Sequence, residues 1–155
     1  DRPGDARVAF DDPLQDHVLD LGAQVGAGDL APMAKAIIAK LNEDLPDLIV
    51  LELGDGILGG YAVDSIFDDS ELREATAAFV FCASDYVGAW GGIELLRRRG
   101  IKVDLIAGSV TDSQMGQDYI ETEFGVPAAN ARRDGALLFA RIRSKIEAAR
   151  EKVAA

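Results

Sequence analysis

The sequence predicts a three-layer α/β domain, in which helices cover both faces of a mostly parallel sheet. Two observations lead to this prediction. Apolar runs of strand length alternate with segments of helical periodicity, and the runs are apolar at consecutive positions rather than at every second one. Strands of a parallel sheet show this continuous pattern because helices bury both of their faces. The 155 residues suffice for one such domain with a full core, so we expect a single domain over residues 1–155.

Composition limits the partners and the location of the chain. It has 27 acidic and 16 basic residues and a formal charge of -11. This excess of acids repels nucleic acid and anionic membranes, and no apolar run is long enough to span a bilayer. The single cysteine, Cys82, lies in the apolar run AAFVFCAS and is expected to be buried; a cytoplasmic location agrees with the lack of a second cysteine. Because the chain starts at Asp1 without a methionine, we expect it to be a piece of a longer protein.

The first third of the chain contains the best strand candidate. Residues 1–12 are polar and rich in helix breakers, so we expect poor order there, with a short strand candidate at Ala6–Phe10 and another in DHVLDLGA. A helix is predicted from about Asp29, its N-cap, to Asp44, with Pro32 in the first turn. The residues with helical spacing are Leu30, Met33, Ile37, Leu41 and Leu45. The run LIVL at 48–51 then predicts a buried strand.

The remaining elements continue the alternation. A short helix is expected in SIFDDSELREAT, a buried strand in AAFVFCA, a helix from Asp85 to Arg99, and a strand in IKVDLIAGSV. Another helix runs from about Ser113 to Phe124, capped by Thr111 or Asp112, and GVPAANA is a last short strand or an extended loop. The closing helix starts at about Asp134. Its apolar stripe consists of Leu138, Ile142, Ile146, Ala149 and Val153.

The bend ELGDGILGG follows the predicted strand at 48–51 and is the main candidate site. Ligands of open α/β sheets bind outside the carboxyl ends of the strands, where Glu52 and Asp55 would lie. These acids could hold magnesium or position a water molecule. The glycines, which could take positive φ and form an anion-binding nest, are Gly54, Gly56, Gly59 and Gly60. The alternative is a tight turn with solvated acids.

Two further junctions were compared with known motifs. LGAQVGAGD at 21–29 contains neither G-x-G-x-x-G nor G-x-x-x-x-G-K-[ST], so a structural turn is favoured there over an anion site. AGSVTDSQMG at 107–116 places Thr111 and Asp112 after a strand, where they could line the same crevice as Glu52 or simply cap the next helix.

His17 has no histidine or cysteine partner for a zinc site or a catalytic triad. Tyr86 and Trp90 are interpreted as surface flank and core.

From about residue 47 to 131, the chain resembles P-loop NTPase-like domains of the dethiobiotin synthetase-like group. The resemblance rests on LIVLELGDGILGG, on FVFCASDYVGAWGGIELLRRRGIKVDLIAG and on ETEFGVPAANA. It implies that Glu52 lies near magnesium and substrate, and that ATP is a candidate cofactor. The family's phosphate loop, with its lysine and Ser/Thr, is absent from the sequence, so ATP turnover cannot be transferred to this chain. Either a missing upstream segment supplies that loop or the domain does not hydrolyse nucleotide.

A second resemblance is to response-regulator receiver domains, which have a flavodoxin-like fold. Asp11 and Asp12 are similar to the acid pair, Glu52 stands at the phosphoacceptor position and Ser84 at the switch hydroxyl. A glutamate would not form the usual aspartyl phosphate, so this resemblance implies a pseudo-receiver. Our leading hypothesis is a domain that binds a phosphate- or carboxylate-bearing small molecule with magnesium. The alternative is a non-catalytic interaction module that pairs, as a homodimer, through its last helix.

Overall fold

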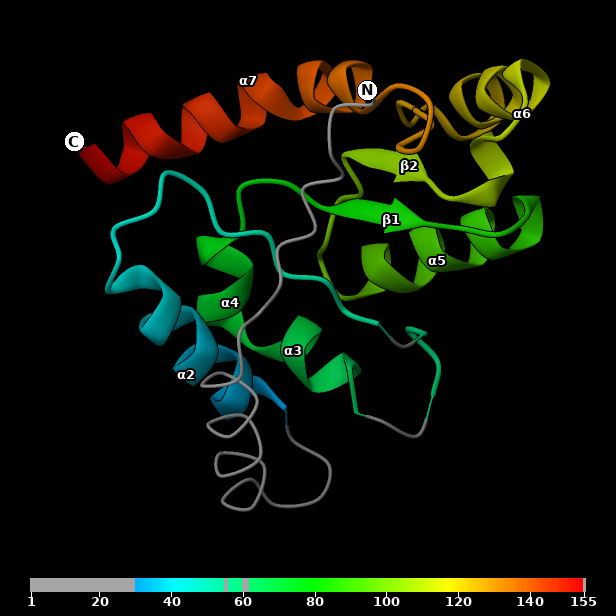
Figure 1. The fold of residues 1–155 in the computed structure, drawn as a ribbon. Coiled ribbons are helices and arrows are strands. Elements are labelled where there is room, and N and C mark those ends of the chain that lie inside the picture. Colours follow the sequence, from blue (N-terminus) through cyan, green and yellow to red (C-terminus); the bar gives the residue numbers. More distant parts are fainter. Residues whose placement is uncertain (1–29, 55, 60–61, 155) are drawn as a thin grey trace, which may run out of the picture. The chain divides into compact units, whose positions relative to one another are not determined.

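The computed structural model describes residues 30–54, 56–59 and 62–154, whose path is shown in Figure 1. The chain divides into two compact units, Asp1–Ile66 and Phe67–Ala155. Several sequence predictions lie outside the described residues. They concern the order of residues 1–12, the strand candidates at Ala6–Phe10 and in DHVLDLGA, the glycine-rich junction at 21–29, His17, and the acid pair Asp11 and Asp12.

The first unit contains helix α2, Ala31–Asn42, which confirms the predicted helix. A proline stands in its first turn, as expected, where the missing N–H removes no helical hydrogen bond. The N-cap residue is Leu30 instead of the predicted Asp29, and it makes no side-chain cap bond. Its backbone N–H instead donates to Ser65 Oγ at 2.8 Å, and that hydroxyl donates to Ala62 O at 2.7 Å. Ser65 belongs to the short helix α3, Asp64–Asp68, so this hydroxyl links the starts of two helices.

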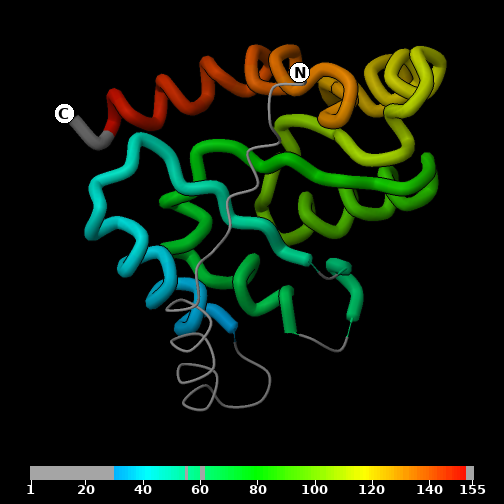
Figure 2. The backbone as a smooth tube through the Cα atoms, in the orientation of Figure 1, coloured from blue at the N-terminus to red at the C-terminus, as the bar shows by residue number. Residues whose placement is uncertain are grey.

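The segment after α2 differs from the prediction, because residues 48–51 form no strand. Figure 2 shows an irregular path between α2 and α3. The helix ends before Leu45, which has a left-handed φ of 51° and is 84% exposed. Val50 is 83% exposed, so it is not a buried strand residue. The run has strand composition, but a strand also needs a hydrogen-bonding neighbour, and none is paired with it among the described residues.

The second unit is built around two parallel strands, β1 (Val80–Cys82) and β2 (Leu105–Ala107), as predicted for these two runs. In their register, Phe81 lies opposite Ile106. On the other side of β2, Ile106 pairs with Ala128 in an isolated parallel bridge, so GVPAANA supplies one bridge rather than a strand. The sheet of the described residues therefore has two strands, and the larger three-layer α/β fold stays a prediction.

One helix packs on each side of this strand pair (Figure 1). On one face lies α7, Gly135–Ala154, whose Leu138 and Ile142 pack against the buried side chains of β2. On the other lies α5, Tyr86–Arg98, whose Gly92 meets the ring of Phe81. The predicted start of α7 is confirmed by Asp134, whose carboxylate accepts a hydrogen bond from Leu137 N at 2.8 Å. The largest fully buried side chains of this core are Leu105, Ile106, Ile120 and Thr111.

The remaining elements are short. The predicted helix in SIFDDSELREAT is divided between α3 and α4, Ser70–Ala75, which Asp69 caps. After β2 come the 3₁₀ helix η1, Ser109–Thr111, and helix α6, Gln114–Tyr119, which continues as a π-helical turn, η2, Ile120–Phe124. Gly125, with a φ of 64°, ends this stretch as a left-handed C-cap.

Cys82 corrects one sequence prediction, because it is exposed instead of buried. The burial pattern along β1 alternates between exposed and half-buried side chains, and Val80 on the same side as Cys82 is 39% exposed. A run of consecutive apolar residues does not reveal which side of a strand a helix covers. In the described part of the chain, no helix combines the length and the hydropathy that crossing a membrane requires.

Candidate functional site

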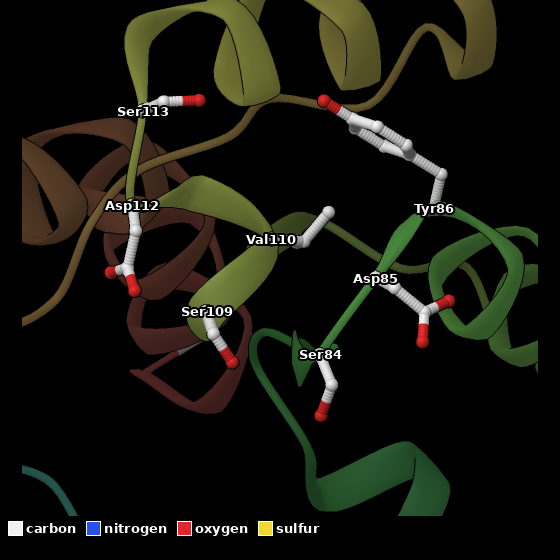
Figure 3. Close-up of a pocket in the computed structure, with 7 residues that line it drawn as sticks. All are labelled: Ser84, Asp85, Tyr86, Ser109, Val110, Asp112 and Ser113. Carbon is white, nitrogen blue, oxygen red and sulfur yellow. The ribbon is translucent and has the colours of Figure 1, made fainter.

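A pocket of about 340 Å³ lies where β1 and β2 end (Figure 3). It is lined by Ser84, Asp85, Tyr86, Ser109, Val110, Asp112 and Ser113. These residues come from the two loops that follow the strands, at the carboxyl edge where parallel sheets bind ligands. Only Val110 among them is buried, so the pocket opens to solvent. Its volume is near the lower end for small-molecule sites, which suits a small ligand.

Backbone hydrogen bonds fix the two strand ends against each other. Ala83 N donates to Ala107 O at 2.9 Å, and Val110 N donates to Ala83 O at 3.1 Å. The turn between them requires Gly108, which has φ 89° and ψ -172°. A Cβ on this glycine would lie 2.5 Å from Ala83 O, closer than side chains approach. The absence of a side chain at this position therefore lets the loop that carries Ser109 and Val110 pack onto the end of β1.

The β1 side of the pocket is the N-terminus of α5. Asp85 is its N-cap residue, and its Oδ1 accepts a hydrogen bond from Gly88 N at 2.8 Å. The ring of Tyr86 packs against Tyr119, with ring centroids 4.4 Å apart. In Figure 3, Tyr86 and Asp85 lie on one side of the pocket, and Ser84 continues from them toward the second loop.

The β2 side contains the two residues that the sequence predicted after this strand. Asp112 lines the pocket, and its Oδ1 accepts a hydrogen bond from Asn130 Nδ2 at 2.8 Å. Thr111 does not line the pocket, because it is fully buried and its hydroxyl donates to Gly108 O at 2.7 Å. Neither of the two is the cap of α6; Ser113 is, accepting a hydrogen bond from Gly116 N at 3.0 Å.

Asn130 is a buried residue that the sequence did not single out. Its Nδ2 donates to Thr111 O at 3.2 Å as well as to Asp112, and its Oδ1 accepts from Arg133 N at 2.9 Å. Arg133 in turn donates from its guanidinium to Asp112 O. The turn before α7 thus holds the Asp112 side of the pocket in place.

The acid and glycine bend looks different from its prediction. Glu52 is exposed and follows no strand, and Asp55 and Gly60 lie outside the described residues. Gly54 and Gly56 do not have left-handed φ, and a Cβ at either would meet no close contact. The expected use of positive φ is therefore wrong at these two glycines. Gly59 is exposed, and the ligand roles of all these residues stay predictions.

The donor set of the pocket fits a hard cation better than a free anion. Its lining has two carboxylates and three serine hydroxyls but no lysine or arginine, so an anion alone would meet like charge. Magnesium prefers oxygen ligands and is usually held by one or two carboxylates together with substrate phosphates. In Figure 3, Asp85 and Asp112 lie on opposite sides of the pocket, with Ser84 and Ser109 between them. Among the described residues, no cluster of three or more metal-ligating side chains occurs. A cation here would therefore need oxygens from its ligand.

Five lining residues were missed as site residues from the sequence: Asp85, Tyr86, Ser109, Val110 and Ser113. The sequence analysis expected ligands at the carboxyl ends of the run at 48–51 and of β2. The same expectation at the carboxyl end of β1 finds Asp85 and Tyr86.

The chain matches no protein-family model, no curated protein and no solved structure. The function proposed below rests on the residues of this chain.

Proposed function

We propose that this chain is a ligand-binding α/β domain that holds a phosphate- or carboxylate-bearing small molecule, together with magnesium, at the carboxyl ends of β1 and β2. The observation that supports the proposal is the pocket itself. It lies at the ends of two adjacent parallel strands, and all of its lining residues except Val110 carry a hydroxyl or a carboxylate group. ATP is the first candidate ligand, and a cytoplasmic location belongs to the same proposal.

The division of roles follows from the charges. Bound magnesium would neutralise the charge of an anionic ligand beside the pocket carboxylates. Asp85 and Asp112 each have one oxygen in a hydrogen bond within the protein, which fixes the orientation of the carboxylate. The serine hydroxyls can donate to ligand oxygens. Because the sequence has no phosphate loop, the proposal concerns binding and includes no hydrolysis.

Isothermal titration with ATP, ADP and inorganic phosphate, each with and without magnesium, tests this proposal. The variants are Asp85→Asn and Asp112→Asn, which remove charge but retain an oxygen that can accept the existing hydrogen bonds. Each should weaken magnesium-dependent binding about tenfold or more, since each removes a charged contact. Glu74→Gln, an exposed charge removal on α4, is the matched control.

Two results would contradict the proposal. One is the absence of binding heat with all three ligands in the presence of magnesium. The other is binding that persists unchanged in both aspartate variants, which would place the ligand outside this pocket. The predicted magnesium role of Glu52 is tested separately, by measuring magnesium-dependent binding in Glu52→Gln. That result is read independently of the Asp85→Asn and Asp112→Asn results.

A further inference from the structure

Five large apolar side chains are exposed together on the second unit. They belong to α5 and α6, and we call them the aromatic patch: Tyr86 (38% exposed), Val87 (76%), Trp90 (59%), Met115 (77%) and Tyr119 (44%). The sequence suggested that Trp90 is a core residue, and the structure places it at the surface instead. Grouped exposure of this kind marks interaction surfaces, whereas single exposed apolar residues are common everywhere.

The patch is continuous across the two helices. On α5, Tyr86 and Trp90 are four residues apart and lie on one side of the helix, and Met115 and Tyr119 have the same spacing on α6. The rings of Tyr86 and Tyr119, 4.4 Å apart, join these two pairs. The patch borders the small-molecule pocket at Tyr86 but extends beyond it along both helices. A small ligand would therefore leave most of it uncovered.

Charge indicates what could cover it. Two exposed acids, Asp118 and Glu123, belong to the same helical stretch as Tyr119. Helix α7, Gly135–Ala154, is basic, because it has five bases and two acids in a chain of charge -11. The acids near the aromatic patch and the bases of α7 have complementary charges. Both surfaces belong to this chain, so a second copy can supply the partner.

Helix α7 has an exposed apolar side chain to match the patch. Leu138 and Ile142 face the core, while Phe139 is 48% exposed, and Arg143, which pairs with Glu147 on the same helix, follows it one turn later. Phe139 can pack against the apolar side chains of the aromatic patch, and the bases of α7 can pair with the acids near it.

We propose that the aromatic patch binds helix α7 of a second copy of this chain, with Phe139 against Trp90 and its neighbours. This proposal does not depend on the proposed small-molecule binding. It names the two surfaces through which copies of the chain associate, the aromatic patch and α7. The contact joins two different surfaces, the aromatic patch of one copy and α7 of the other. Two copies form a closed dimer when each patch binds the other copy's α7. When only one such contact forms, one patch and one helix stay open and further copies can add to the assembly.

Sedimentation velocity of the whole chain over a concentration series, at low and high salt, tests the proposal. We expect reversible self-association that salt weakens, because opposite charges meet across the contact. Trp90→Glu and Phe139→Glu should each weaken association about tenfold or more. Leu58→Glu, at an apolar residue that is 76% exposed outside the patch, is the control and should leave association unchanged.

The two variants also distinguish this contact from its alternatives. Association between two patches would survive Phe139→Glu, and association between two α7 helices would survive Trp90→Glu, so either survival overturns the proposal. A chain that remains monomeric at all concentrations overturns it as well. Mixing the two variants should restore pairs, because one intact patch then meets one intact helix. Circular dichroism checks folding, and Val87→Glu replaces Trp90→Glu should that variant not fold.

Discussion

At the scale of single residues, the pocket depends on one glycine. Gly108 combines a φ of 89° with a place directly against the backbone of Ala83. Gly108→Ala should lower the free energy of unfolding by about 3 kcal/mol or more, since it adds backbone strain to a clash with a carbonyl oxygen. Urea unfolding measures the change.

Gly91 is the matched control for this substitution. It lies inside α5, and a Cβ there would meet nothing within 4 Å. Gly91→Ala should stabilise the protein by about 0.5 to 1 kcal/mol, because alanine is the better helix residue. Equal effects of the two substitutions would show that the close approach at Gly108 is unimportant.

These glycines show what sequence reasoning could find of the site. Asp112 was found because the rule for strand ends needs only the order of elements and the residue after the strand. Gly108 was not found, because its role depends on the backbone of Ala83, which is 25 positions away and is brought close only by the parallel pairing. The glycines at 54 and 56 were conspicuous in the sequence, yet their backbones do not require glycine.

Ionisation of Glu94 gives a prediction about pH. Hydrogen bonds from Arg97 and then Arg98 lower the pKa of its carboxyl from 4.5 to about 2. A lowered pKa means that these ion pairs stabilise the fold fully above about pH 4.5, and that this contribution is lost as the pH falls toward 2. NMR titration of the Glu94 carboxyl should give a midpoint near pH 2.

The control replaces both partners of Glu94. In Arg97→Gln with Arg98→Gln, the midpoint should return toward the ordinary pKa of 4.5, and high salt should move the wild-type midpoint in the same direction. A wild-type midpoint already near 4.5 would mean that the guanidinium groups do not hold the carboxylate in solution.

At the scale of elements, the distance between α5 and β1 is set by a glycine and a ring. A Cβ on Gly92 would lie 2.1 Å from Cε1 of Phe81. Gly92→Ala should cost about 1 to 3 kcal/mol of unfolding free energy, because the helix or the ring must move. The double variant with Phe81→Leu should be more stable than the sum of the two single effects predicts, by about 1 kcal/mol. Simple additivity, measured by urea unfolding, would contradict the contact.

Two helix starts were predicted at the right residue from a local chemical signal, whereas the caps predicted for α2 (Asp29) and α6 (Thr111 or Asp112) were wrong by one or two residues. Asp85 before α5 and Asp134 before α7 accept the hydrogen bonds that N-cap residues accept. Pairing of strands has no such local signal. The runs at 48–51 and in β1 look alike as sequence, but only the second has a hydrogen-bonded neighbour among the described residues. Apolar composition therefore predicted extended backbone, and tertiary context decided which run became a strand.

At the scale of the whole molecule, the second unit has helices packed against a two-stranded parallel sheet, and the predicted three-layer fold with a larger sheet stays a prediction. Its parallel strands, the bridge at Ala128 and the helices on both faces all lie after residue 67. Alternation of apolar runs and helical segments was sufficient to predict parallel pairing here, because a strand followed by a helix and a second strand pairs in parallel. The number of strands could not be predicted, since each run needs a neighbour that the pattern does not identify.

Because the second unit has a core and hydrogen bonds of its own, residues 67–155 should fold as a separate fragment. The buried side chains of β2, the packing of Leu138 and Ile142, and the hydrogen bonds between Ile106 and the 127–129 segment all lie inside these limits. The expected result is a dispersed amide NMR spectrum in which the signals of β1 and β2 match those of the whole chain. In the whole chain, the amides of Ile106 and Ala129 should be the slowest to exchange, because they donate the bonds that join the bridge to β2. A fragment with poorly dispersed signals would show that the unit needs residues 1–66 to fold, and the two units would then form one cooperative structure.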